Sequence, residues 1–285
     1  MIYTEYFKPF VPEIYKINTI LNKLETCIQN KTSFSHIRFG DGGIKFIDAI
    51  LNKDVEQLII INNKEGIPDE KVIEVMKLWG QYASEADFID SPEVYFNDTF
   101  WARVKKPGKD INADTKIKML KWKELYDFAG FGDNNSYCNP ESNYLMLIRR
   151  KYQKTIFDIM KGRKIALITA IPEVKNNLRD YDVDIFPIVK QYENHYENSF
   201  RKVIAFIKEK ANDYDLIINA SGELGRIYSG LIKREGGRVV DIGFVVEYWN
   251  TGYLHPRLKH YMMPNPNNKL ELKLTKQGLK YTKWI

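Results

Sequence analysis

Two glycine-containing turns, each at the end of an apolar run, carry the residue types best suited to chemistry. The first lies in residues 36–43 (His-Ile-Arg-Phe-Gly-Asp-Gly-Gly), and the second closes residues 216–225 (Leu-Ile-Ile-Asn-Ala-Ser-Gly-Glu-Leu-Gly). Each pattern is typical of a strand that runs through a tight turn into a helix, where backbone N–H groups can bind a phosphate. The two turns together predict a site for a phosphorylated or nucleotide-linked ligand.

The first turn combines an acid with two flexible positions. Asp41 stands between Gly40 and Gly42, and Arg38 precedes them. An acid on a strand-to-helix turn at the carboxyl edge of a sheet can hold a ribose or a divalent cation. Aspartate between glycines is also a common turn residue, because it tolerates a left-handed backbone and caps helices. We therefore hold both a ligand-binding and a purely structural role open for Asp41.

The second turn offers a hydroxyl, an acid and two glycines. Gly222 and Gly225 would let the backbone approach a ligand closely, and Ser221 can donate a hydrogen bond. Glu223 could serve as a general base. The structural alternative is a helix cap, with Ser221 at the N-cap and Glu223 favoured by the helix dipole. A Gly-x-Gly-x-x-Gly fingerprint is absent here, which argues against a nicotinamide enzyme.

A third segment, residues 241–249, follows another apolar run. Its strand is predicted to end near Gly243, so that Asp241 and Glu247 lie close to the edge that the two turns share. Alternatively, Asp241 bonds a neighbouring turn, and Tyr248 and Trp249 are core residues. The segment thus adds two candidate acids to the predicted site.

Strands and helices must alternate to bring these segments together. Strand-like runs occur at residues 34–39, 164–169, 183–188, 215–220 and 238–243, with helical patterns at 11–30, 43–52, 69–86, 195–211 and 224–235. This alternation predicts an α/β fold with a Rossmann-like, mostly parallel sheet and helices on both faces. Residues 88–144 are rich in aromatic side chains and predict a helical insertion. We expect one domain over residues 1–285, ending in a basic tail at 252–285.

Composition restricts the class of protein. The chain has 285 residues, 44% of them hydrophobic, and 43 basic against 37 acidic residues give a net charge of +6. No compact basic block predicts nucleic-acid binding. Two cysteines without metal spacing, and no signal-like or membrane-spanning run, predict a cytoplasmic protein. The basic tail is compatible with peripheral contact with an anionic membrane or with an ordinary solvated surface.

The histidines are few and show no zinc-binding spacing. His36 lies within an apolar strand, which predicts a buried core residue. His255 lies in the basic tail with Arg257, where both could neutralise a phosphate. The oligomeric state is not predicted by any of these patterns.

The turns and the third segment resemble the GT-D-fold glycosyltransferases of bacteria. Residues 38–43 match the family's opening Arg-Phe-Gly-Asp-Gly-Glu at five of six positions. Residues 220–225 occupy the place of its Leu-Gly-Pro-Thr-Ala turn. Residues 241–244 and 247–249 then correspond to its Asp-Ile-Gly-His strand and Glu-Tyr-Trp. Residues 162–168 fit its central Gly-Arg strand more loosely, and the resemblance spans roughly residues 30–250.

The resemblance implies an enzyme that uses a nucleotide-diphosphate sugar, usually UDP-linked, to build glycans of bacterial surface proteins or polysaccharides. A hexosyltransferase-type activity follows, with a glycan or glycoprotein acceptor bound by the aromatic segment. Asp41 carries over as the first acid of the family's Asp-x-Glu motif, which is implicated in metal and sugar-nucleotide binding. The resemblance thus implies Asp41 as a metal ligand. We predict Asp41, Glu223 and Glu247 as the catalytic residues. We expect donor binding to involve Arg38, Gly40, Gly42, Ser221, Gly222, Gly225, Arg226 and Asp241.

Two departures from the family pattern affect the predicted chemistry. Gly43 replaces the second acid, and Phe244 replaces the family's histidine. One carboxylate with diphosphate oxygens and water could hold Mn²⁺ or Mg²⁺ weakly. The alternative is a metal-independent enzyme, in which Arg38, Arg226 or Arg257 neutralises the leaving diphosphate. A non-catalytic nucleotide-sugar-binding subunit, and a Rossmann-like methyl- or phosphoryl-transferase, are the other functions that the sequence leaves open.

Overall fold

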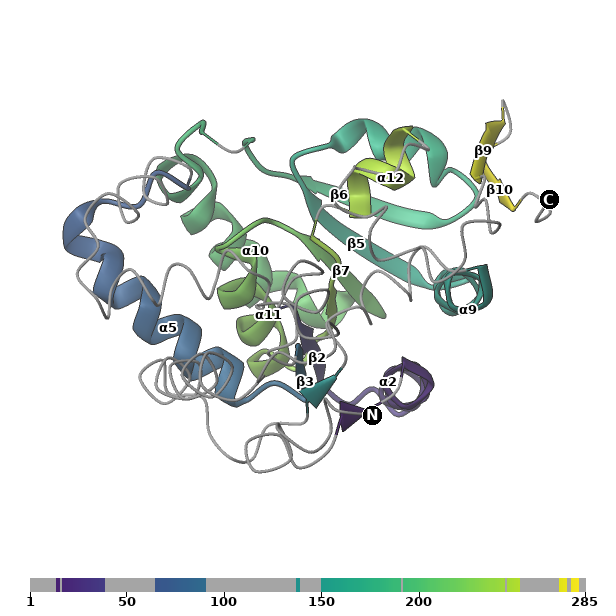
Figure 1. Ribbon diagram of the computed structural model, residues 1–285, viewed down its shortest axis with the longest axis horizontal. Helices are drawn as coiled ribbons and strands as arrows, with labels where there is room; N and C mark the ends of the chain where they lie inside the picture. Colours follow the sequence, from purple (N-terminus) through teal and green to yellow (C-terminus); the bar gives the residue numbers. More distant parts are fainter. Residues whose placement is uncertain are drawn as a thin grey trace, which may run out of the picture.

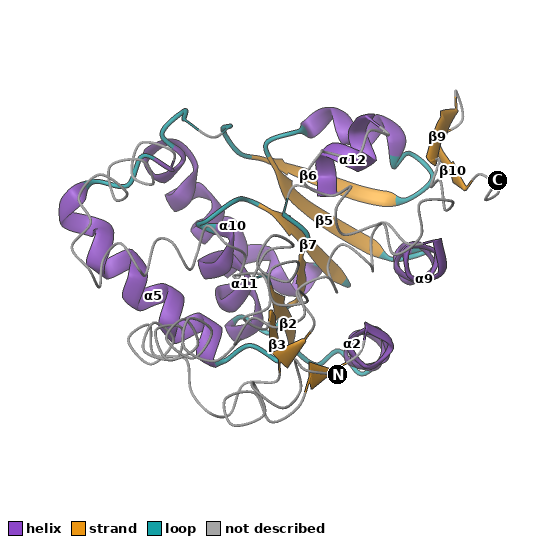
Figure 2. Cartoon of the chain, in the orientation of Figure 1, coloured by secondary structure: helices purple, strands orange, loops and turns teal. Residues whose placement is uncertain are grey.

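A parallel sheet flanked by helices on both faces organises the chain (Figure 1; Figure 2). The computed structural model describes residues 14–15, 17–38, 65–90, 137–138, 150–190, 192–243, 245–251, 272–275 and 278–281. Its strands are β1 (Ile14–Tyr15), β2 (Phe34–Ile37), β3 (Phe88–Asp90), β4 (Tyr137–Cys138), β5 (Lys164–Thr169), β6 (Asp182–Pro187), β7 (Leu216–Ala220) and β8 (Arg238–Asp241). The strand order is β1-β4-β3-β2-β8-β7-β5-β6, and every pair is parallel.

The chain runs outward from the middle of the sheet in both directions. From β2 it proceeds through β3 to β4, and from β5 it proceeds to β6, whereas β7 and β8 fill the space between these halves. Ligands of open α/β sheets bind outside the carboxyl ends of strands where the strand order reverses. Here the direction in which the chain adds strands reverses between the neighbours β5 and β7. From β5 it continues outward to β6, and from β7 it continues in the opposite direction to β8.

The central strands are apolar because both faces of the sheet are buried. Along β5, Ile165 and Leu167 pack into one hydrophobic cluster, and Ala166 and Ile168 pack into the other. A half-exposed strand would alternate polar and apolar residues, but a strand covered on both faces reads as a continuous apolar run. This is why the strand signal in the sequence was strong in these segments.

Each face carries its own set of helices (Figure 1). One face packs against α5 (Val72–Ser84), α10 (Arg201–Lys210) and α11 (Gly225–Arg234). The other packs against α2 (Ile17–Gln29), α9 (Arg150–Met160) and α12 (Val245–Thr251). Shorter helical turns are η1 (Asp69–Lys71), η3 (Pro172–Asn177), η4 (Tyr196–Phe200) and η5 (Ala211–Asp213).

The predicted α/β architecture is confirmed, and most boundaries differ from the prediction by one to three residues. The helix predicted at 195–211 is α10 preceded by the π-helical turn η4. His36 is fully buried, as predicted for a core residue, and burial lowers its pKa to about 3. Tyr248 and Trp249 are also buried, on α12.

Other predictions fall mostly outside the described residues. The expected insertion at 88–144 contains two strands of the sheet, β3 at its start and β4 at residues 137–138, and its remaining residues lie outside the described ones. The predicted helix at 43–52 also lies outside them. In the basic tail, β9 (Leu272–Thr275) and β10 (Gly278–Tyr281) form a two-stranded antiparallel sheet. The single-domain organisation stays a prediction.

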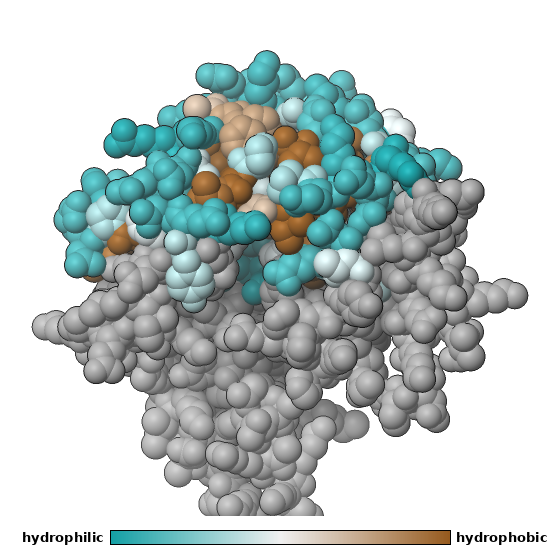
Figure 3. All heavy atoms as spheres, turned by 90° about the horizontal axis from the view of Figure 1, so that it is seen from above, coloured by the Kyte–Doolittle hydropathy of each residue, from teal (hydrophilic) through white to brown (hydrophobic). Residues whose placement is uncertain are grey.

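The described part of the face shown in Figure 3 is predominantly polar. Seen from above, hydrophilic side chains surround smaller hydrophobic areas. Ile73 and Tyr192 are the large apolar side chains that are exposed in the part of the chain that the structure describes. Within the same part, none of the helices combines the length and the apolar character that crossing a membrane requires.

A close contact between α5 and α11 gives a stability prediction. Gly230 of α11 lies directly against the Tyr82 side chain of α5, and a Cβ atom at position 230 would overlap that side chain. Gly230→Ala should raise helix propensity by about 1 kcal/mol, but overpacking costs about 1–3 kcal/mol. The overlapped atom is Tyr82 Cβ, which cannot move without the α5 backbone, so the overpacking cost lies at the upper end of this range. We expect a net loss of about 2 kcal/mol in the free energy of unfolding, measured by urea denaturation.

Gln81→Ala on the exposed side of α5 is the control, and it should stay within about 0.5 kcal/mol of the wild type. A Gly230→Ala protein as stable as the wild type would contradict the close packing of α5 on α11.

Candidate functional site

Three adjacent strands bring the predicted site segments to one edge of the sheet. β8 lies between β2 and β7, with His36 opposite Val240 and Asn219 opposite Asp241. Because the three strands are parallel, their carboxyl ends meet at the same edge. Arg38 follows β2, the turn at 221–225 follows β7, and Asp241 ends β8, so residues about 200 positions apart become neighbours.

Asp241 is a buried acid at the centre of this edge. Its carboxylate accepts hydrogen bonds from the backbone N–H groups of Gly243, at 3.0 Å, and of Arg38. Burial raises the pKa of Asp241 to about 6, although the positive charges of Arg38 and Arg226 and the two N–H bonds oppose this rise. Desolvation therefore outweighs the attraction of both guanidinium groups.

The Arg38 guanidinium lies over Gly243. Gly243 has a φ of +50°, which disfavours residues with a Cβ atom, and a Cβ there would collide with the Arg38 guanidinium. Arg38 itself is half-buried. The positive charge of Arg38 is thus held against the turn that follows β8, where it interacts electrostatically with the Asp241 carboxylate.

The turn at residues 221–225 is held from the inside by Asn219. The Asn219 Nδ2 group donates to the carbonyl oxygen of Gly225 at 2.6 Å and to Ser229 Oγ at 2.8 Å. Ser221 Oγ donates to Asn219 Oδ1. Asn219, the penultimate residue of β7, therefore fixes both ends of the turn that leads into α11.

Glu223 and Arg226 form a buried ion pair. The Arg226 guanidinium binds the Glu223 carboxylate, donates to the Glu223 carbonyl oxygen at 3.2 Å, and lies 4.9 Å from the centre of the Trp79 ring. Glu223 is 8% exposed and Arg226 only 3%. Proton abstraction by Glu223, and ligand binding by Arg226, would each need this pair to open; both roles stay predictions.

The backbone of the same turn is partly engaged with the protein. The N–H of Glu223 donates to Glu65 Oε1 at 3.4 Å, and the N–H of Gly225 donates to the carbonyl oxygen of Gly222 at 3.3 Å. Gly222 is the exposed residue of the turn, whereas Ser221 is buried. Phosphate binding by this turn stays a prediction, and Gly222 is the residue of the turn that a ligand could reach from solvent.

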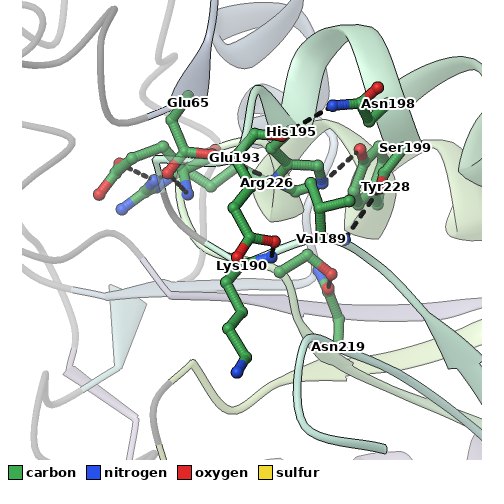
Figure 4. A network of polar contacts seen from close by, with 12 residues as sticks. Glu65, Val189, Lys190, Glu193, His195, Asn198, Ser199, Asn219, Arg226 and Tyr228 are labelled. Carbon is green, nitrogen blue, oxygen red and sulfur yellow. Dashed lines mark hydrogen bonds and ion pairs between the residues drawn. The ribbon is translucent and has the colours of Figure 1, made fainter.

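Sequence reasoning missed two buried residues that meet this turn. Glu65 and His195 are hydrogen-bonded to each other at 3.1 Å, and His195 is bonded to Tyr228 of α11 at the same distance (Figure 4). Neither Glu65 nor His195 belongs to a motif, and 130 positions separate them. His195 is one of four histidines in the chain, and this rarity was the one signal that pointed to it.

Glu247 stands apart from this cluster, in the first turn of α12. Its side chain is exposed, whereas the neighbouring Tyr248 and Trp249 are buried against the opposite face of the sheet. Among the predicted catalytic acids inside the described residues, Glu247 is thus the one open to solvent.

The described donor set does not fit a divalent cation. No group of three or more histidine, cysteine or acidic side chains that could hold a metal occurs in the described part of the chain. Asp241, the acid at the centre of the edge, interacts with two guanidinium groups. Gly40, Asp41 and Gly42 lie outside the described residues, so the metal prediction at Asp41 stays a prediction.

Comparison with solved structures shows which fold this is. Over 95% of this chain and 94% of the other, the structure matches one described as a new glycosyltransferase (DUF1792) from Streptococcus sanguinis, with a TM-score of 0.52 and 14% identity. A second structure, described as a domain of unknown function 1792 with a distinct glycosyltransferase fold, matches over 93% and 90% with a TM-score of 0.49 and 16% identity. No family model and no curated protein matches the chain.

The chain has the DUF1792 glycosyltransferase fold. The resemblance of its short motifs to GT-D-fold glycosyltransferases is thereby confirmed at the level of the fold. At 14% identity, the similarity shows the backbone arrangement alone. The choice of candidate site residues therefore depends on the geometry described above.

The buried acid Asp241 predicts a pH effect on stability. Asp241 has a pKa of about 6 in the folded state and 3.8 in the reference state. The folded protein therefore binds this proton more tightly, so unfolding free energy falls as pH rises from about 4 to 6. The shift corresponds to about 3 kcal/mol.

Asp241→Asn keeps an acceptor for the Gly243 N–H but cannot ionise. We expect the difference in unfolding free energy, wild type minus Asp241→Asn, to fall by about 3 kcal/mol between pH 3 and 7. Other titrating groups, including His36, cancel in this difference. Parallel stability curves for the two proteins would contradict the raised pKa.

Proposed function

We propose that this protein is a glycosyltransferase that uses a nucleotide-diphosphate sugar, UDP-linked, and a glycan or glycoprotein acceptor in bacterial surface glycan synthesis. The observation that carries the proposal is the DUF1792 glycosyltransferase fold together with the convergence of Arg38, the 221–225 turn and Asp241 at one sheet edge. The acceptor hydroxyl attacks the anomeric carbon, and the nucleoside diphosphate leaves.

In this function, the positive charge of Arg38 stabilises the negative charge of the leaving diphosphate. Arg38 is half-buried, and Asp241 binds its backbone N–H and attracts its guanidinium. A fixed cation placed where negative charge develops on the leaving group stabilises the transition state. Arg226 has a different task, because its ion pair with Glu223 and its stacking on Trp79 hold the turn.

Nucleotide binding tests the proposal most directly. Thermal denaturation with UDP, GDP, CDP or S-adenosylmethionine, each with and without Mn²⁺, should show stabilisation by UDP. A ligand at one hundred times its Kd stabilises the folded state by about 2.7 kcal/mol. Stabilisation by S-adenosylmethionine alone would favour a methyltransferase, and no stabilisation by any nucleoside diphosphate would reject the proposal.

Arg38→Gln should weaken UDP binding tenfold or more, since a charge-assisted hydrogen bond contributes about 1.5–3 kcal/mol. Arg38→Lys retains the charge and should lose less affinity. Isothermal titration calorimetry measures both values. Equal affinities in the wild type and Arg38→Gln would remove Arg38 from the diphosphate site.

Glu247 is the general base that the proposal favours for an inverting reaction. Its side chain is exposed in the first turn of α12, whereas the Glu223 carboxylate is committed to Arg226. General-base catalysis contributes about 10²–10⁴-fold to a rate. Glu247→Gln should therefore lower kcat at least about 100-fold while leaving UDP affinity unchanged.

Transfer from a panel of nucleotide sugars measures this loss of kcat, and Glu209→Gln, at an exposed acid on α10, is the matched control. Unchanged kcat in Glu247→Gln would exclude Glu247 as the base. UDP binding without transfer or slow hydrolysis by the wild type would instead identify a non-catalytic nucleotide-sugar-binding subunit.

A further inference from the structure

Three buried polar side chains form a continuous hydrogen-bonded chain beneath the candidate site. Glu65 Oε2 and His195 Nδ1 are 3.1 Å apart, and His195 Nε2 and the Tyr228 hydroxyl are also 3.1 Å apart (Figure 4). Glu65 and Tyr228 are fully buried, and His195 is 3% exposed. Burial, with the nearby charge of Glu65, raises the pKa of Tyr228 well above its usual value, so Tyr228 keeps its proton.

This hydrogen-bonded chain of side chains joins segments that are distant in sequence. Glu65 precedes α5, His195 ends the loop after β6, and Tyr228 lies on α11. The first two segments are pressed together, because a Cβ atom added at Gly66 would lie 2.5 Å from the Cα of Asn194. The hydrogen-bonded chain therefore links the loop after β6 to α11, the helix that follows the 221–225 turn.

Hydrogen bonds within the loop after β6 fix the position of His195. The N–H of Val189 donates to Ser199 Oγ at 3.0 Å, and the N–H of Lys190 donates to Glu193 Oε2 at 3.1 Å. Asn198 Nδ2 donates to the carbonyl oxygen of Glu193 at 2.8 Å (Figure 4). The loop is thus a well-defined support for the ring of His195.

At its Glu65 end, the hydrogen-bonded chain reaches the 221–225 turn. The second carboxylate oxygen of Glu65, Oε1, accepts the N–H of Glu223 at 3.4 Å. This bond approaches the turn from the α5 side, whereas Asn219 holds it from the β7 side through Gly225 and Ser221. The turn is thus fixed by two polar groups, and Gly222 is its exposed residue.

Stability alone does not account for such a chain. Burying a carboxylate costs several kcal/mol, and well-packed apolar residues of similar volume are often as stabilising or more so. Apolar packing has no direction, whereas hydrogen bonds set the orientation of the groups they join. The arrangement therefore orients the backbone that it contacts.

We propose that Glu65 and His195 are positioning residues that hold the 221–225 turn in the geometry that receives the diphosphate of the donor. The proposal rests on the donor-binding function proposed for this edge. Glu65 acts on the turn directly, His195 orients Glu65, and Tyr228 orients His195. None of the three touches the ligand.

The test compares Glu65→Ala and Glu65→Gln with Ile207→Ala. Glu65→Gln keeps an acceptor for the Glu223 N–H, and Glu65→Ala removes it. Ile207→Ala creates a cavity in the same apolar cluster, on α10, without touching this polar chain. It serves as the control for a general loss of stability, and all three variants are compared as folded full-length proteins.

Amide hydrogen exchange of residues 221–226 is the first readout. We expect exchange at least tenfold faster in Glu65→Ala than in the wild type, within threefold of the wild type in Glu65→Gln, and unchanged in Ile207→Ala after correction for global stability. Equal exchange in Glu65→Ala and Ile207→Ala would overturn the proposal.

Donor affinity is the second readout. For UDP, Kd should rise about tenfold in Glu65→Ala and His195→Ala, about threefold in Tyr228→Phe, and remain unchanged in Ile207→Ala. In sugar transfer, the KM for the UDP-sugar should rise with kcat within threefold of the wild type. Unchanged Kd and KM in Glu65→Ala, with UDP bound by the wild type, would overturn the proposal.

If the wild type binds no nucleoside diphosphate, the proposed function fails, and the exchange data alone decide whether Glu65 holds the turn. If Glu65→Ala does not fold, His195→Ala and Glu65→Gln provide the same comparison. His195→Ala must then show the faster exchange of residues 221–226, and its absence rejects the positioning role.

Discussion

The parallel pairing of β8 between β2 and β7 is the constraint on which the site depends. It places the ends of three strands side by side, although their residues come from opposite ends of the chain. Side chains alternate between the faces of a sheet, so a slip of one residue in β8 would turn Asp241 away from the face that carries α11. Register, more than any single side chain, brings Asp241, Arg38 and Arg226 together.

Burial of charge explains how this edge is organised. Glu65, Glu223 and Asp241 are all buried acids, and each one has partners of its own: His195 for Glu65, Arg226 for Glu223, and backbone N–H groups for Asp241. Removing either member of such a pair would leave an uncompensated buried group. The site is therefore a connected polar layer inside an otherwise apolar sandwich, and its geometry is set by hydrogen bonds.

The fold was largely predictable from the sequence, because its strongest signals are local. β5 and β7 are apolar runs that both faces of the sheet bury, and Gly236 and Gly237 separate α11 from β8. The positions of Arg38, Ser221 and Asp241 at strand ends were also predictable, since each stands at the end of such a run, whereas their roles stay predictions. The boundary between η4 and α10 was not predictable, because a π-helical segment of five residues is about one turn and is too short to show a spacing of its own.

The amino-acid sequence by itself determined the alternation of strands and helices, the two turns, and the acids that stand at strand ends. Tertiary structure alone decided what those acids do. It committed Glu223 to Arg226, raised the pKa of Asp241 through burial, and placed Glu65 against a turn 158 positions away. The reason is physical: secondary structure follows from neighbours along the chain, whereas desolvation and charge pairing depend on neighbours in space.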